Sequence, residues 1–180
     1  MINHNHVVQV HFIRQSEKIV MGRLLLKERK IFFEYAPEFL KTDLELSPFK
    51  LPLKPGVLVC EDPLYDGLFG VFNDSLPDGW GRLLLDRKLM KTGIHPNELT
   101  PLDRLCYVGS RGMGALSYQP ETEDITPSLH DDLDEIAYEC LQFQENEDDQ
   151  FVDDLLVMNG SSAGARPKIL VTLIENKFQS

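Results

Sequence analysis

Three short stretches in which apolar and polar residues alternate follow one another at the start of the chain. They span residues 7–13, 20–26 and 30–35, and only a few polar residues separate each from the next. Alternation with a period of two is typical of strands that bury one face. Because such short connections can join only antiparallel neighbours, the sequence predicts an antiparallel meander. This meander is the β-rich start of what we expect to be an α+β fold.

Helical patterns follow the meander, after a stretch that prolines interrupt. Pro48, Pro52 and Pro55 favour an irregular edge strand there, because proline cannot donate a hydrogen bond to a neighbouring strand. The next elements are three helices and then a strand, predicted over residues 67–76, 77–91, 101–107 and 115–118. The second helix carries a cluster of basic side chains, which forms either a solvated face or a patch that binds a partner.

A strongly acidic segment separates these elements from the C-terminal residues. Residues 112–165 contain no lysine or arginine, and residues 121–154 carry fourteen carboxylates. The whole chain has a net charge of −11, which disfavours general binding to nucleic acid or to an anionic membrane. An apolar stripe within the segment predicts an acidic amphipathic helix. The difference in charge and periodicity predicts two parts, residues 1–120 and residues 121–180.

The three cysteines, Cys60, Cys106 and Cys140, lie far apart and include no C-x-x-C pair. This spacing favours neither a disulfide scaffold nor a zinc site, so we expect no bound metal. The N-terminus lacks the basic and apolar regions of a signal peptide, and no stretch approaches the roughly 18 apolar residues of a membrane span. We therefore expect a cytoplasmic protein that contacts neither membranes nor nucleic acid directly.

Residues 158–168 form a run rich in glycine, alanine and serine that ends in a lysine. Such a run lets backbone N–H groups approach an anion closely, and the following residues 169–174 are typical of a β-strand. The spacing of Gly160 and Gly164 does not match the G-x-x-x-x-G-K-[ST] loop, and a G-x-G-x-x-G loop is also absent. The segment is therefore either a loop that binds nucleotide phosphates or an ordinary polar turn into a strand.

Four groups of sequence blocks extend over nearly the whole chain. They comprise F-E-Y (33–35) with L-S (46–47) and L-P-L (51–53), residues 69–82 with N-D-S-L-P-D-G (73–79), R-L-C-Y-V-G (104–109) with G-A-L (114–116), and S-S-A-G-A-R-P-K (161–168). In this order the blocks resemble the N-terminal part of the HipA-family serine/threonine kinase toxins. Each block alone is a weak signal, whereas four groups in register make the resemblance specific.

This resemblance implies a fold, an activity and a site. HipA-type proteins are toxins of bacterial toxin–antitoxin pairs, with a β-rich N-terminal subdomain, a glycine-rich loop over Mg²⁺-ATP and a helical lobe that holds the catalytic aspartates. They typically phosphorylate an aminoacyl-tRNA synthetase, and their partner is a helix-turn-helix antitoxin. The resemblance places six residues of this chain at ATP: Ser161, Ser162, Ala163, Gly164, Ala165 and Lys168. It also places a regulatory phosphorylation site at Ser161, with Ser162 as the alternative.

The expected architecture is a β-rich N-terminal subdomain with helices, followed by an acidic helical element that leads to the kinase-like glycine-rich loop and strand. The family places its catalytic aspartates and Mg²⁺ ligands well beyond this loop, whereas the sequence ends twelve residues after Lys168. We therefore expect no catalytic residue in this chain, no phosphate transfer by the chain alone, and ATP and Mg²⁺ only in the complete kinase.

Three hypotheses about function follow. In the first, the chain is the N-terminal portion of a HipA-type kinase. In the second, it is a stand-alone module that binds a separate kinase lobe in the manner of an antitoxin. In the third, it is an α+β domain of unrelated function.

Overall fold

The computed structural model describes most of the first 122 residues and two short strands near the C-terminus. The described residues are 7–15, 17–60, 63–77, 79–91, 93–112, 114–122, 172–174 and 177–179. The chain divides into two compact units, the first made of Met1–Leu76 with Asn97–Glu123 and the second of Pro77–Pro96 with Asp124–Ser180. The boundary at residue 120 that charge and periodicity suggested stays a prediction.

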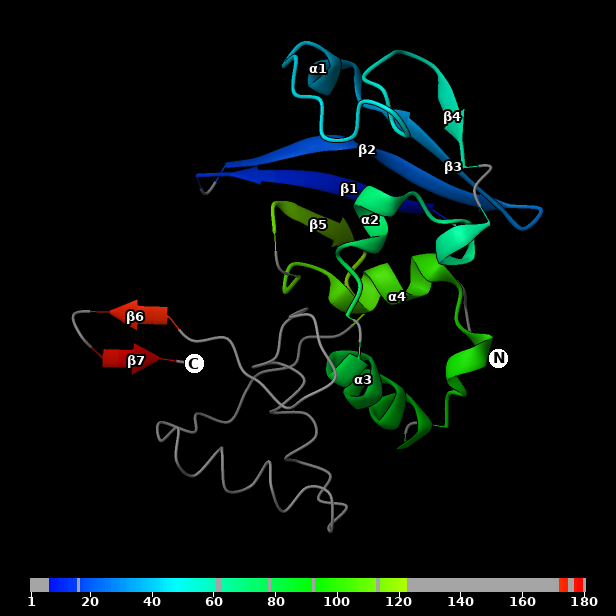
Figure 1. Ribbon diagram of the computed structural model, residues 1–180, viewed down its shortest axis with the longest axis vertical. Coiled ribbons are helices and arrows are strands. Elements are labelled where there is room, and N and C mark those ends of the chain that lie inside the picture. Colours follow the sequence, from blue (N-terminus) through cyan, green and yellow to red (C-terminus); the bar gives the residue numbers. More distant parts are fainter. Residues whose placement is uncertain are drawn as a thin grey trace. The chain divides into compact units, whose positions relative to one another are not determined.

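The first unit is built on a five-stranded antiparallel sheet (Figure 1). Its strands are β1 (Val7–Arg14), β2 (Glu17–Lys27), β3 (Lys30–Tyr35), β4 (Val57–Val59) and β5 (Leu116–Gln119). In space they follow the order β4-β3-β2-β1-β5. The first three strands form the predicted meander, with Val8 opposite Leu24 and Leu24 opposite Phe33. β5 comes from far along the chain to pair with β1, which leaves β4 at the other edge.

One face of this sheet carries the hydrophobic core of the unit. The strands contribute buried side chains to it from Val8, Val10, Leu24, Ile31, Phe33, Tyr35, Leu116 and Tyr118. The ring of Phe33 contacts the rings of Tyr35, Phe69 and Phe72, at centroid distances of 4.8, 6.4 and 5.0 Å. Full burial of a side chain of this size contributes roughly 1.5–3 kcal/mol. The alternation in the sequence therefore produces a sheet with one closed, aromatic-rich face.

Gly22 in β2 occupies a position where only glycine fits. It lies opposite Val10 on one neighbouring strand and Tyr35 on the other. A Cβ atom at this position would collide with the carbonyl oxygen of Glu34 and would lie 2.6 Å from the ring of Phe33. The absence of a side chain thus lets the Phe33 ring pack directly against the backbone of β2.

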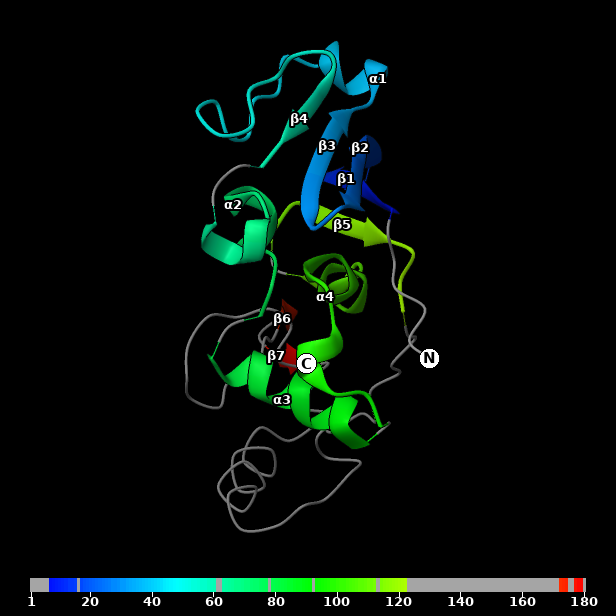
Figure 2. The ribbon, with the colours of Figure 1, turned by 90° about the vertical axis from the view of Figure 1, so that its right-hand side faces the viewer.

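Three helical segments supply the rest of this core. α1 (Pro37–Leu40) follows β3, while α2 (Gly70–Asn73) and α4 (Pro101–Val108) lie on the same side of the sheet (Figures 1 and 2). At the start of α4, the Thr100 hydroxyl accepts a hydrogen bond from the Asp103 backbone N–H, and the Asp103 carboxylate accepts one from the Thr100 N–H. This reciprocal capping fixes the start of the helix that the sequence predicted.

The helix predicted over residues 67–76 is much shorter in the structure. The segment η1 (Leu64–Gly67) is a turn in which Tyr65 and Asp66 have φ angles of 60° and 55°. Phe69 then has an extended backbone, with φ of −63° and ψ of 136°, and α2 covers only the four residues that follow. Gly67 with a φ of 79° and the extended residues Leu68 and Phe69 cannot continue a right-handed helix, so the first three residues of the predicted range are not α-helical.

The described part of the second unit contains the helix α3 (Gly79–Lys91) and a hairpin of β6 (Thr172–Ile174) with β7 (Lys177–Gln179). α3 ends as predicted at a glycine, since Gly93 has a φ of 78° and its N–H bonds back into the last turn. A short 3₁₀ turn, η2 (Pro96–Glu98), lies between α3 and α4 in the chain. Among the described helices, none has the length and apolar character needed to cross a bilayer.

Candidate functional site

The residues that the family resemblance leads us to expect at ATP lie outside the described residues. These are Ser161, Ser162, Ala163, Gly164, Ala165 and Lys168, which include both candidate phosphorylation sites. The acidic helical element lies outside them as well. β6 coincides with the end of the predicted strand 169–174. In the described ranges, no group of three His, Cys, Asp or Glu side chains could hold a metal ion.

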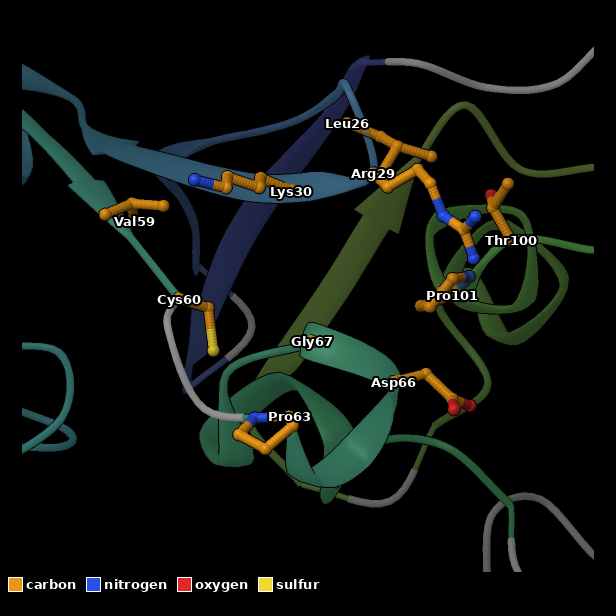
Figure 3. A pocket seen from close by; sticks show the side chains of 10 residues that line it. All are labelled: Leu26, Arg29, Lys30, Val59, Cys60, Pro63, Asp66, Gly67, Thr100 and Pro101. Carbon is orange, nitrogen blue, oxygen red and sulfur yellow. The ribbon is translucent and has the colours of Figure 1, made fainter.

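The first unit contains a cleft of about 780 Å³ that gathers residues from three distant parts of the chain (Figure 3). The β2–β3 hairpin forms one wall, the end of β4 and the turn before α2 form another, and the start of α4 closes one end. The lining residues are Leu26, Arg29, Lys30, Val59, Cys60, Pro63, Asp66, Gly67, Thr100 and Pro101. A cleft of this size is comparable to sites that hold small molecules or short peptide segments.

The β2–β3 hairpin brings two positive charges to the rim of the cleft. The strands are joined by two residues, Glu28 and Arg29, with φ angles of 52° and 63°. Two consecutive left-handed residues are characteristic of the type I′ turn, whose twist matches that of a hairpin. Arg29 extends from this turn toward Pro101, whereas Lys30 extends along β3 toward Val59 (Figure 3). Among the described residues, neither cation has an ion-pair partner.

A left-handed turn forms the opposite wall. Tyr65, Asp66 and Gly67 have φ angles of 60°, 55° and 79° in succession. A non-glycine residue in this conformation costs on the order of 1–2 kcal/mol, and such strain is common at ligand clamps. Asp66 extends toward the same end of the cleft as Arg29 (Figure 3), and it too lacks an ion-pair partner within the described part of the chain. The cleft therefore has two cations on one wall and a carboxylate on the other.

Between the charged walls, the cleft is lined by apolar groups and a thiol. Leu26 and Val59 supply apolar surface, and Cys60 is half-buried at the end of β4. The second described cysteine, Cys106, lies in the core, where burial and the nearby Asp103 raise the pKa of its thiol to about 12. Cys106 is therefore an inert, protonated thiol at neutral pH.

A comparison with protein families identifies the domain that carries this cleft. The model of the HipA N-terminal domain matches residues 15–119, which is more than half of the chain. The chain belongs to the HipA family. No curated protein and no solved structure matched it. The matched range includes β2 to β5 and all ten described residues that line the cleft. The cleft is therefore a feature of the HipA N-terminal domain of this chain.

On the face opposite its core, the first unit leaves apolar side chains exposed. Four of them have exposed fractions between 37% and 63%: Val7, Leu25, Val57 and Val59. Next to them, Arg23 of β2 and Glu34 of β3 form an ion pair with an N–O distance of 2.7 Å. A small cavity of about 260 Å³ lies among these side chains. Arg23 and Glu34 on this face are thus paired with each other, whereas Arg29, Lys30 and Asp66 at the cleft have no ion-pair partner among the described residues.

Two pairs of polar side chains are buried in the first unit. The hydroxyls of Ser75 and Tyr118 lie 2.6 Å apart and share a hydrogen bond, and burial raises the pKa of Tyr118. His11 lies opposite Ser117 across β1 and β5, and neither side chain has a hydrogen-bond partner among the described residues. Burial, assisted by the charge of Lys18, lowers the pKa of His11. His11 is therefore neutral at pH 7.

The charged residues of the cleft were not singled out from the sequence. The short interval between the predicted strands 20–26 and 30–35 indicates a tight hairpin, and that signal could have placed Arg29 at its tip. No sequence pattern near this hairpin indicates that Asp66 or Pro101 lies close to it in the fold. The cleft arises from tertiary packing of segments that are far apart in the chain, which a pattern in one sequence does not reveal.

Proposed function

We propose that this chain is the N-terminal portion of a HipA-like toxin kinase. In the complete enzyme, the γ-phosphate of ATP is transferred to a serine or threonine hydroxyl of a protein substrate, for which an aminoacyl-tRNA synthetase is the expected target. The observation that carries the proposal is the match of the HipA N-terminal domain to residues 15–119. The glycine-rich residues 160–168 follow this domain in the chain, as the ATP loop does in the family, and this order supports the same assignment.

In this proposal the glycine-rich segment positions ATP and neutralises its charge. The backbone N–H groups of residues 161–165 are the donors for phosphate oxygens, and Lys168 supplies the positive charge. Phosphoryl transfer also needs an aspartate that orients the attacking hydroxyl and carboxylates that hold Mg²⁺. We assign these groups to the helical lobe of the kinase. ATP and Mg²⁺ are therefore cofactors of the complete enzyme rather than of this chain alone.

The role of the loop is tested in the complete kinase with one lysine variant and one matched control. Lys168→Ala is expected to lower the rate of phosphate transfer on the order of 10²-fold, because it removes a charge that stabilises the transferring group. Lys177→Ala removes the same charge from the β7 strand and is expected to leave the rate nearly unchanged. Equal rates for the two variants would contradict the assignment of Lys168.

The same proposal includes a switch at the start of the loop. A phosphate on Ser161, or on the adjacent Ser162, adds about −1.5 to −2 charges where the phosphates of ATP must lie, and repulsion then blocks nucleotide binding. In the complete kinase, Ser161→Asp and Ser162→Asp are compared for ATP affinity. Loss of affinity in one variant identifies the switch residue, and unchanged affinity in both removes the switch from the proposal.

A second candidate function is a stand-alone module that binds a separate HipA-type kinase lobe. The cleft charges of Arg29, Lys30 and Asp66, which lack ion-pair partners in the part of the chain that the structure describes, favour it, because they are suited to binding rather than to chemistry. Purified chain is added to a complete HipA-type kinase to separate the two candidates. Saturable inhibition of phosphate transfer by that kinase supports the antitoxin-like module. If the chain restores phosphate transfer to a kinase lobe that lacks its own N-terminal domain, the first proposal is supported. In either case the expected partners are proteins, either a kinase lobe or a helix-turn-helix antitoxin.

A further inference from the structure

The outer edge of β4 is available to pair with another strand. β4 lies at the edge of the sheet, and β3 is its neighbour among the described strands. The Cys60 N–H donates to the Ile31 carbonyl at 3.0 Å, so that Val59 and Phe32 face each other without mutual hydrogen bonds. By the same alternation, the backbone N–H and C=O groups of Val57 and Val59 point away from β3.

The side chains at this edge are apolar and exposed. Val57 is 63% exposed and Val59 is 38% exposed. Edge strands are usually protected by charged side chains, by proline or by short length. β4 has three residues and follows Pro55, so it cannot support a long added strand, and none of its own side chains is charged. These features suit a short extended segment.

The cleft begins where β4 ends. Val59 and Cys60 line it, so a segment that pairs with β4 continues directly into it. Arg29 and Lys30 stand at its rim without ion-pair partners among the described residues (Figure 3). A single carboxylate on the bound segment is the group that complements these two positive charges. The apolar lining between the walls is complementary to small apolar side chains beside that carboxylate.

We propose that the β4 edge and the cleft together bind an extended segment of a partner polypeptide. The segment adds a short strand beside β4 and places an acidic side chain at Arg29 and Lys30. In this mode of recognition, backbone hydrogen bonds supply affinity and pockets for alternate side chains supply specificity. The inference concerns the surface of the N-terminal domain and does not depend on phosphate transfer.

The lining of the cleft favours a polypeptide over a nucleic acid. Binding of single-stranded nucleic acid without sequence preference relies on aromatic side chains that stack on the bases, and the described lining residues include no aromatic ring. A nucleic acid also carries a phosphate charge on every nucleotide, and the carboxylate of Asp66 opposes such repeated charge. A single acidic side chain can bind to the cations while it avoids Asp66.

Peptide selection on the intact chain tests the proposal. A library of random displayed peptides is selected against the chain, and an enriched peptide is synthesised with a fluorescent label for anisotropy titrations. The enriched peptides are expected to contain an acidic residue next to β-branched residues. Arg29→Glu/Lys30→Glu is expected to weaken binding by about tenfold or more, because charge reversal places like charges at the contact. The control Arg14→Glu/Lys18→Glu makes the same change of charge near the β1–β2 turn and is expected to keep the affinity.

A backbone variant separates strand addition from simple charge attraction. Val57→Pro removes an N–H that points away from β3, so it leaves the sheet bonds intact while it prevents pairing with an added strand. We expect loss of peptide binding with little change in thermal unfolding, whereas Val57→Ala retains binding. The proposal is overturned if no peptide is enriched, if the charge-reversed variant binds equally well, or if inorganic phosphate or oligothymidine competes as effectively as unlabelled peptide.

Discussion

The two faces of the five-stranded sheet have different chemistry although they are made from the same strands. On one face, Phe33 and its aromatic neighbours are buried beneath α2 and α4. On the other face, Val7, Leu25 and Val57 remain exposed, and the charges of Arg23 and Glu34 are paired at the surface. We infer that the closed face determines stability, while the open face, the β4 edge and the adjoining cleft are available for binding. Substitutions on the two faces therefore have different expected effects.

The largest expected effect comes from truncation of the central aromatic side chain. Phe33→Ala removes a fully buried ring that contacts three other rings, and the expected loss of unfolding free energy is about 3–5 kcal/mol. Phe32→Ala is the matched control, since the neighbouring residue points to the opposite face and is only half-buried. Urea unfolding of both variants measures the difference. Equal losses would show that the two faces do not differ in stability.

A smaller loss is expected where the closed face requires glycine. Gly22→Ala introduces a Cβ that collides with the Glu34 carbonyl and the Phe33 ring, with an expected cost of roughly 1–3 kcal/mol from overpacking. At Gly70 the nearest atom to an added Cβ is 3.7 Å away, so Gly70→Ala is expected to be close to neutral. Thermal unfolding compares the two variants. A neutral Gly22→Ala would mean that Phe33 does not pack on the β2 backbone as described.

The buried hydroxyl pair is expected to contribute a comparable or smaller amount. Tyr118→Phe leaves the Ser75 hydroxyl buried without its partner, at an expected cost of about 1–2 kcal/mol. Tyr65→Phe removes a hydroxyl from a ring that is 53% exposed and is expected to change little. Ser75→Ala together with Tyr118→Phe is expected to recover part of the loss, because no polar group is then left unpaired. A double variant less stable than the sum of both single changes would contradict this interpretation.

The smallest effect is expected on the open face. Glu34→Gln breaks the ion pair with Arg23, whose side chain is 68% exposed, so the expected loss is below about 1 kcal/mol. The loss is also expected to disappear in about 1 M salt, where the screening length is short. Urea unfolding at low and high salt gives both values. A larger, salt-independent loss would show that this face is less open to solvent than described.

The meander, α4 and β5 could be predicted from the sequence because each has a local signal. Period-two alternation predicted the first three strands, and Thr100 before Pro101 marks the start of α4. The left-handed residues Tyr65 and Asp66 could not be predicted, because neither residue type requires that conformation. The tertiary fold holds them there.

The two candidate sites also differ in whether the sequence or the structure reveals them. The proposed ATP-loop residues 161–168 are recognisable only as a sequence block, since glycine, serine and lysine close together form a local pattern. The cleft is recognisable only in the structure, because Arg29 and Asp66 come from separate segments that tertiary packing brings to opposite walls. A local sequence pattern can indicate a loop, whereas a cleft between distant segments can be found only when the fold is known.

The most direct test of the account measures transfer of labelled phosphate from ATP in the presence of Mg²⁺. The chain is assayed alone and together with a HipA-type kinase lobe that lacks its own N-terminal domain, each with an aminoacyl-tRNA synthetase as substrate. We expect no incorporation with the chain alone and incorporation when the lobe is added. If the chain alone incorporates phosphate and Lys168→Ala abolishes this incorporation, the result contradicts the proposal that this chain is a non-catalytic N-terminal portion of the kinase.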